Sequence, residues 1–242
     1  MLDHWDENYI LCDIGPIPLV DSIVDVQDLI VLAEHMYGYR RPIAHWTLDE
    51  AEGNIAYDKI GDNNALIYGG ALFQPTEGMF SGALELDGID DYASIDFVLN
   101  PADSEFSVFI WIKGGLPGQV ILSQIDGVNW LLADPSEGKL MTNLSRPPGG
   151  RTSPPPLVSE VTITDGQWHR IGFVWDGVYR ALYVDDILIA EDSQAGLADS
   201  VGGLNFGCGN DFETTTFWSG LIDDVRIYDV ALNSDQIAAL IH

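Results

Sequence analysis

Two carboxylates lie two residues apart in the stretch GALELDGIDDYASI, residues 82–95. In a strand, Glu85 and Asp87 would point to the same side, because alternate residues of a strand share a face. Two carboxylates on one face can divide the nucleophile and acid roles of glycosidic-bond hydrolysis. The spacing leaves two interpretations open, a catalytic strand or an acidic structural strand.

A second carboxylate pair, Asp223 and Asp224, lies in the stretch GLIDDVRIY. On a strand, Asp223 would share a face with Leu221, Val225 and Ile227, which predicts that it points into an apolar interior. A buried carboxylate must find hydrogen-bond donors, a base or a metal. Because the chain has only 10 Lys and Arg residues, a cation is an attractive partner. Backbone N–H groups at a strand bend are the alternative.

Exposed aromatic rings could bind a sugar, since the apolar face of a pyranose matches a flat ring. Trp130 and Trp218 flank predicted loops, and Tyr179 lies beside Arg180 at the approach to a hairpin, so these three aromatic residues are candidate ligand-binding residues. A structural role is the alternative for each. The other tryptophans of apolar strand-like runs are expected in the core: Trp46, Trp111, Trp168 and Trp175.

A proline-rich stretch, SRPPGGRTSPPPLV (residues 145–158), predicts a long surface loop, because proline does not fit a central strand. It carries Arg146 and Arg151. Arg151 is a further candidate ligand-binding residue, since loops on rigid scaffolds often carry specificity. A proline-stiffened insertion without a binding role is the alternative.

The elements that would position these residues are strands. From residue 42 onward, strand-like runs recur between turn signals: IAHWTLDE, ALELDG, DYASIDF, FSVFIWIKG, GQVILSQ, GKLMTNL, HRIGFVWDG, RALYVDDILIAE and SGLIDDVRIYDV. Many antiparallel strands at short intervals predict an all-β fold, a two-sheet antiparallel sandwich or jelly roll.

Two local signals refine this fold. RALYVDDILIAE predicts a hairpin whose turn contains Asp185 and Asp186, with slight strain because glycine is favoured at the second turn position. Asn233 and Gln236 have the spacing of a capping box, which predicts a short C-terminal helix.

The charge of the chain excludes several classes of partner. Asp and Glu number 38 against 10 Lys and Arg, a formal net charge of −28. Such a surface repels nucleic acid and anionic membranes, and it suits neutral ligands and divalent cations. No apolar run approaches the roughly 18 residues of a membrane helix, so no membrane insertion is expected. Cys12 and Cys208 are too few for a disulfide framework, and we do not expect them to pair.

Residues 1–41 differ from the rest and form the first of two predicted domains, before a β-domain over 42–242. The stretch VDVQDLIVLAEHMYG has helical apolar spacing, and it resembles half of a dockerin repeat. Asp21, Asp25 and Asp28 fit the fifth, ninth and twelfth loop positions, but the first and third fall on Ile17 and Leu19, which offer no side-chain oxygen to calcium. We therefore interpret it as a partial, degenerate dockerin-like segment, with a plain helical linker as the alternative.

Four stretches in order resemble the laminin-G-like branch of the concanavalin A-like lectin/glucanase superfamily. They are AHWTLDEAEGNIAYDKIGDNNALIYGGA, GALELDGIDDYASI, DGQWHRIGFVWDGVYRALYVDDILIA and FWSGLIDDVRIYDVALNSDQIAAL. The resemblance implies that the strand of Glu85 and Asp87 is an ordinary sandwich strand. Its lettering nearly matches the E-x-D-x-x-E run of laminarinase-type hydrolases, but Asp90 stands where that branch has its acid/base glutamate.

The resemblance also implies cofactors and function. Members of this fold often hold a structural Ca²⁺ near the sandwich edge, which places the expected ligands among Asp49, Asp91, Asp223 and Asp224. We expect a non-catalytic, lectin-like bacterial module, secreted or on the cell surface, that recognises a polysaccharide or glycoconjugate as part of a larger protein. The chain itself shows no signal-peptide pattern. The alternatives are an adhesion or scaffolding domain that binds a surface protein, and a glycoside hydrolase or lyase.

Overall fold

The computed structural model describes residue 30, residues 40–147 and residues 155–240. The chain divides into two compact units, Met1–Arg41 with Asn233–His242, and Pro42–Leu232. The dockerin-like segment falls, apart from Ile30, outside the described residues, so its helix and its loop remain predictions.

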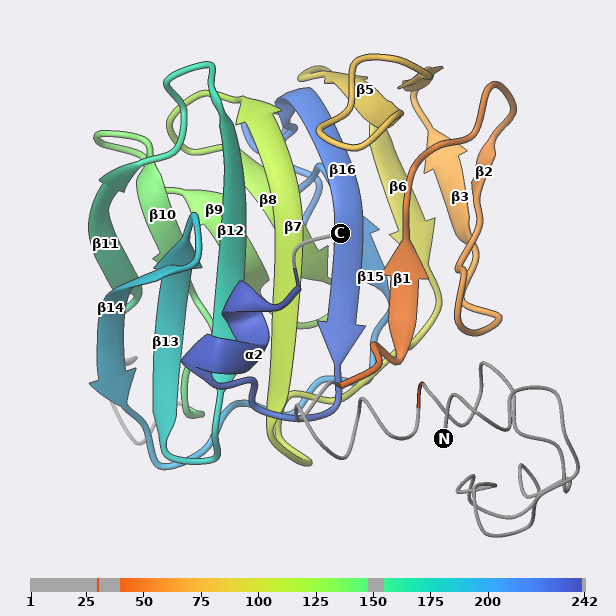
Figure 1. The fold of residues 1–242 in the computed structure, drawn as a ribbon. Helices are drawn as coiled ribbons and strands as arrows, with labels where there is room; N and C mark the ends of the chain where they lie inside the picture. Colours follow the sequence, from red (N-terminus) through yellow and green to blue (C-terminus); the bar gives the residue numbers. More distant parts are fainter. Residues whose placement is uncertain (1–29, 31–39, 148–154, 241–242) are drawn as a thin grey trace, which may run out of the picture. The chain divides into compact units, whose positions relative to one another are not determined.

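The second unit contains two antiparallel sheets, drawn in Figure 1 as two layers. The first sheet has eight strands, and β1 pairs with β16 beside its main path. In spatial order, its strands are β14 (Ile187–Ser193), β13 (Tyr179–Val184), β12 (Trp168–Trp175), β7 (Phe106–Gly114), β16 (Ser219–Tyr228), β5 (Ala83–Asp87) and β4 (Leu72–Gln74), with β1 (Ala44–Trp46) on β16.

The second sheet also has eight strands. In spatial order they are β11 (Leu157–Thr162), β10 (Lys139–Thr142), β9 (Asn129–Ala133), β8 (Val120–Gln124), β15 (Leu204–Phe206), β6 (Tyr92–Ile95), β3 (Ala65–Tyr68) and β2 (Ile55–Ala56). The predicted all-β two-sheet sandwich is therefore confirmed. The predicted loop over 145–158 is shorter at its end, because Leu157 already begins β11.

The core lies between the inner faces of the two sheets. Alternate residues of β7, such as Val108, Ile110 and Ile112, are fully buried in one continuous apolar cluster. Trp46 of β1 meets Phe206 of β15 edge to face, with ring centroids 5.0 Å apart. Aromatic and β-branched residues on these strands bury enough apolar surface to hold the sheets together.

The two local signals are confirmed. Asp185 and Asp186 form the turn between β13 and β14, with φ of 50° and 69°, a region that side chains other than glycine seldom adopt. In the first unit, α2 (Ser234–Ala238) begins with a capping box in which the Asn233 and Gln236 side chains accept from each other's backbone N–H. Among the described residues, no helix combines the length and apolarity needed to cross a membrane.

Candidate functional site

Two chain crossings between the sheets lie against each other at one rim of the sandwich. One links β3 to β4 through Gly69 and Gly70, and the other links β5 to β6 through residues 88–91. They approach so closely that a Cβ on Gly69 would lie 2.3 Å from the Asp90 carbonyl oxygen, and Gly69 has a φ of +84°. Only glycine allows both this contact and this conformation.

A groove of about 290 Å³ lies at this rim. Its described lining consists of Gly69, Gly70, Leu72, Glu85, Asp87 and Asp91. Leu72 and Glu85 are exposed and face each other across β4 and β5. The volume is near the lower limit of small-molecule sites, the scale of one or two sugar rings.

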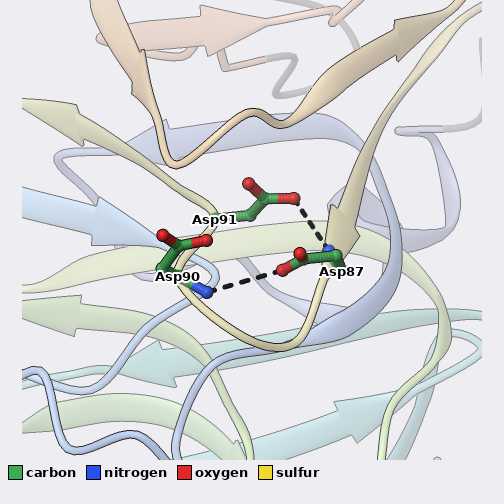
Figure 2. Close-up of side chains that lie close together, drawn as sticks. All are labelled: Asp87, Asp90 and Asp91. Carbon is green, nitrogen blue, oxygen red and sulfur yellow. Dashed lines mark hydrogen bonds between the residues drawn. The ribbon is translucent and has the colours of Figure 1, made fainter.

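Three carboxyl groups surround the β5–β6 turn in Figure 2. An Asp91 carboxylate oxygen accepts a 2.9 Å hydrogen bond from the Asp87 backbone N–H, and Asp87 in turn accepts from the N–H groups of Ile89 (2.8 Å) and Asp90 (3.4 Å). Ligand atoms of Asp87, Asp90 and Asp91 lie within 4.8 Å of one another. Burial, and then repulsion from Asp87 and Asp90, raise the pKa of Asp91. These groups hold a dense set of hydrogen-bond acceptors at the groove.

An aromatic patch adjoins the groove along the chain, because Tyr68 precedes Gly69 and Tyr92 follows Asp91. The rings of Tyr68 and Tyr92 stack with centroids 4.8 Å apart and planes at 12°. Phe212 meets Tyr92 edge to face at 5.2 Å. Tyr68 is 42% exposed and Phe212 39% exposed. Tyr92 alternates with the core residue Ala93 on β6, so the patch presents its flat rings to solvent on the outer face of the second sheet.

The expectation that Trp130 and Trp218 offer exposed rings is wrong. Both side chains are fully buried in the apolar cluster. Trp130 packs against Phe106 with centroids 5.2 Å apart. The flanking loops are where the backbone turns, but both indoles fold inward and cannot stack on a ligand.

Tyr179 and Arg146 lie near a second groove. Tyr179 is 48% exposed, and its register partner Ser193 lines a groove of about 570 Å³ together with Arg146, Pro155, Val178, Gln194 and Ala195. Arg151 belongs to residues 148–154, outside the described chain, so its assignment remains a prediction. The ligand-binding role of Tyr179 likewise remains a prediction.

Asp223 is buried as expected, but it does not point into the core between the sheets. Its register partner is Trp111, whereas its neighbour Ile222 pairs with the core residues Leu84 and Ile112, so Asp223 lies on the outer face of the first sheet. A β-bulge between Asp223 and Arg226, with Asp224 at a φ of 48°, restores Val225 to the core side. Trp111, expected in the core, is only half-buried, because it lies between the core residues Ile110 and Ile112 of β7 and therefore points to the outer face of the first sheet.

A turn over residues 78–82 covers Asp223. The Phe80 N–H donates to Asp223 Oδ2 at 2.9 Å, and the Gly82 N–H donates to Asp49 Oδ1 at 2.8 Å. Within the described residues, Asp223 Oδ1 is buried without a hydrogen-bond partner. Burial above all, with repulsion from Asp224 and Asp49, raises the pKa of Asp223 to about 7. A buried oxygen without a partner, beside a second carboxylate, fits a cation ligand.

The four expected calcium ligands are not brought together. Asp49 and Asp223 meet at the turn, but Asp224 Oδ1 binds His45 Nε2 at 2.7 Å, and Asp224 also pairs with Arg226. Burial alone would raise the pKa of Asp224, but His45 and Arg226 hold it below the ordinary value. Asp91 lies at the rim beyond the other end of β5, where it bonds to Asp87 rather than to residues near Gly82.

Sequence reasoning missed Tyr68, Tyr92 and the groove. It treated Glu85 and Asp87 as a catalytic pair or as ordinary strand residues, not as part of the lining of a groove. The available signal was local: an aromatic residue next to a turn in both LIYGG and IDDYA. Which two turns meet in space depends on the sheet order, which these stretches do not state.

The sequence and the fold of this chain were compared with those of known proteins. A family model described as the concanavalin A-like lectin/glucanases superfamily (Laminin_G_3) matches residues 87–238. A search of curated proteins found no match.

Solved structures share the fold. The binding domain of Paraclostridial Mosquitocidal Protein 1 superposes with a TM-score of 0.66 at 16% identity, over 83% of this chain and 51% of that one. Domain 4 of AbnA, a GH43 extracellular arabinanase from Geobacillus stearothermophilus solved with arabinotriose, gives 0.61 at 19% identity, over 84% and 100%. The botulinum neurotoxin serotype D ligand-binding domain, solved with N-acetylneuraminic acid, gives 0.61 at 16% identity, over 82% and 50%. This chain spans about half the length of the two toxin domains.

Proposed function

Since this chain belongs to the concanavalin A-like lectin/glucanases superfamily, we propose that it is a non-catalytic module that binds a carbohydrate at the rim groove. The observation that carries the proposal is a carboxylate-lined groove whose two chain crossings each adjoin, along the chain, one of two stacked rings, Tyr68 and Tyr92. Two of the structural neighbours were solved with a carbohydrate bound, arabinotriose in one and N-acetylneuraminic acid in the other, and this supports the same class of partner. The setting that we propose is a secreted or surface-displayed bacterial protein.

The chemistry of the groove matches that of a sugar. The apolar face of a sugar ring can lie on the exposed ring of Tyr68. The tilt of the Tyr68 ring is fixed because it stacks on Tyr92. Sugar hydroxyls are donors, and ionised carboxylates accept hydrogen bonds that are about twice as strong as neutral ones. Asp87 and Asp91 are held by backbone N–H groups, so their oxygens are positioned before a ligand arrives.

Incubation with a panel of soluble and insoluble polysaccharides tests the proposal, with depletion of protein from solution as the readout. We expect Tyr68→Ala to weaken retention roughly fivefold to tenfold, since an aromatic contact is worth about 1 kcal/mol. Tyr57→Ala, at a tyrosine that is 51% exposed, is the control and should bind like the parent chain. Loss of binding in Tyr179→Ala instead would move the site to the groove at Arg146.

A second candidate function has one observation in its favour, because Glu85 and Asp87 both line the groove. A carboxylate pair in a cleft is what a glycoside hydrolase requires. New reducing ends in the same tubes would show hydrolysis, and Glu85→Gln should then abolish them. Binding without reducing ends keeps the non-catalytic module. Absence of both would favour the third candidate, an adhesion domain with a protein partner.

We further infer a structural Ca²⁺ at the turn over residues 78–82. Asp223 and Asp49 would be its side-chain ligands, with backbone carbonyls and water completing the 6–8 oxygens that calcium requires. The ion would neutralise the buried carboxylate and fix the turn on the outer face of the first sheet. Asp224, already bound by His45 and Arg226, is not needed.

A further inference from the structure

We propose that the rim groove selects uncharged glycans and rejects glycans that carry a carboxylate, such as sialylated or uronic-acid sugars. This inference rests on the proposed function, since it names the ligand class of the same groove. It comes from the charges that surround the ligand rather than from the aromatic rings.

All charged residues in the described lining of the groove are acidic. Three of its six described lining residues are carboxylates, Glu85, Asp87 and Asp91. Asp90 adds a fourth, with its ligand atom within 4.8 Å of those of Asp87 and Asp91. Polar side chains of the lining can therefore accept hydrogen bonds, but they offer no positive charge to an anion.

No base belongs to the described lining of the groove. Along the outer face of the first sheet, the base in register with Glu85 is Lys113, and Leu221 on β16 lies between them. Two strand spacings, about 10 Å, separate those backbones. The single charge of Lys113 is also outnumbered by the three carboxylates of the lining, so the groove stays net negative.

A ligand carboxylate would thus meet several like charges at short range. One unit charge about 4 Å from another is disfavoured roughly fivefold even in bulk water, and more beside a protein surface of lower dielectric constant. Hydroxyl groups at the same positions would instead donate to the carboxylates. The same wall that binds a neutral sugar therefore excludes its acidic counterpart.

Matched ligands isolate the charge. Trigalacturonic acid is compared with its fully methyl-esterified form, and 3′-sialyllactose with lactose, beside neutral arabinotriose, xylotriose and cellotriose, at 20 mM and 300 mM ionic strength. We expect at least one neutral glycan to bind, and each acidic ligand to bind at least tenfold more weakly than its neutral counterpart at low salt. The difference should narrow at high salt, because salt screens the repulsion.

The variant Glu85→Gln/Asp87→Asn removes two charges and keeps an acceptor oxygen on each side chain. It should narrow the neutral-to-acidic affinity ratio by at least fivefold. The control Glu105→Gln/Asp229→Asn also removes two negative charges, both at exposed positions. These positions lie at the other end of the first sheet: β16 pairs with Asp87 through Ser219 at one end, and with Ser107 through Tyr228 at the other. The control should leave the ratio unchanged.

The outcomes separate this inference from the proposed function. Equal or tighter binding of the acidic ligands would overturn the selectivity and leave carbohydrate binding standing. An unchanged ratio in the groove variant, or an equal change in the control, would also overturn it. If no glycan binds at either salt concentration, the proposed function fails, and the selectivity fails with it.

Discussion

Both oxygens of Asp192 bind the guanidinium of Arg180, at 2.5 Å to Nε and 2.7 Å to Nη2. Arg180 is fully buried. Its other N–H groups donate to the carbonyl oxygens of Leu144 (2.5 Å) and Pro155 (2.9 Å). Leu144 lies just before the proline-rich stretch and Pro155 lies near its end, so one side chain on β13 connects the two ends of the stretch to the first sheet.

Replacing Asp192 with alanine should destabilise the protein by about 2–3 kcal/mol. The change leaves a buried guanidinium without its carboxylate, which costs about 3–5 kcal/mol for fully buried pairs, and Asp192 is one-third exposed, so a smaller loss is expected. Urea unfolding at pH 7 measures it. Glu191→Gln, at the adjacent exposed position of β14, should change stability by less than about 0.5 kcal/mol. An equal loss in both variants would show that strand β14, not the ion pair, is sensitive.

Calcium should stabilise the protein through Asp223. At a concentration 100 times its dissociation constant, a ligand that binds the folded state adds about 2.7 kcal/mol, which corresponds to a rise in Tm of roughly 5–10 °C for a domain of this size. Thermal unfolding at pH 8 with calcium and with chelator measures the shift. Asp223→Asn should abolish it, and the exposed control Asp229→Asn should retain it. If the parent chain shows no shift, the turn over residues 78–82 holds Asp223 without a metal.

Asp58 should make stability depend on acidic pH. Burial alone would raise its pKa, but hydrogen bonds from the backbone N–H groups of His45 (2.9 Å) and Ile60 (3.0 Å) and from Asn63 hold the pKa below the ordinary value. A carboxyl group whose pKa is lower when folded contributes stability above its unfolded pKa, near 4, and loses it as pH falls through the folded pKa.

Asp58→Asn should therefore cost about 1–2 kcal/mol at pH 7 and much less near pH 2. Unfolding free energies of both proteins between pH 7 and pH 2 give the comparison. Asp62→Asn, at an exposed neighbouring position, serves as the control and should give a small difference that does not vary with pH. A constant loss for Asp58→Asn at every pH would assign the effect to the shape of the turn rather than to ionisation.

Much of the fold was predictable because strand periodicity and turn chemistry are local. The β13–β14 hairpin and the capping box at Asn233 depend on residues close in sequence, and both are confirmed. The face of Asp223 was not predictable, because one extra residue at the bulge reverses the alternation on which the prediction depended. Trp130 was predicted to be exposed because it lies next to a loop, but such a residue can still point into the core.

The site depended on contacts that no local pattern contains. Tyr68 and Tyr92 are 24 positions apart and stack only because β3 pairs with β6. The strain expected at Asp185 and Asp186 is present as positive φ, but the sequence did not show what offsets it. Asp185 accepts from the Arg170 N–H at 3.0 Å, and Asp186 forms an ion pair with the Arg170 side chain.

Because Arg170 offsets the strain at one turn, replacing aspartate with glycine should stabilise the protein at one turn and destabilise it at another. Asp126 has a φ of 58°, is exposed, and its carboxylate makes no hydrogen bond or ion pair in the described chain, so Asp126→Gly should stabilise the protein by about 0.5–1 kcal/mol by relieving the backbone. Asp186→Gly relieves a φ of 69° but removes a charge-assisted hydrogen bond worth about 1.5–3 kcal/mol. A net loss of about 1–2 kcal/mol is expected in urea unfolding. Stabilisation by both glycines would mean that backbone strain at this turn exceeds the contribution of the Arg170–Asp186 pair.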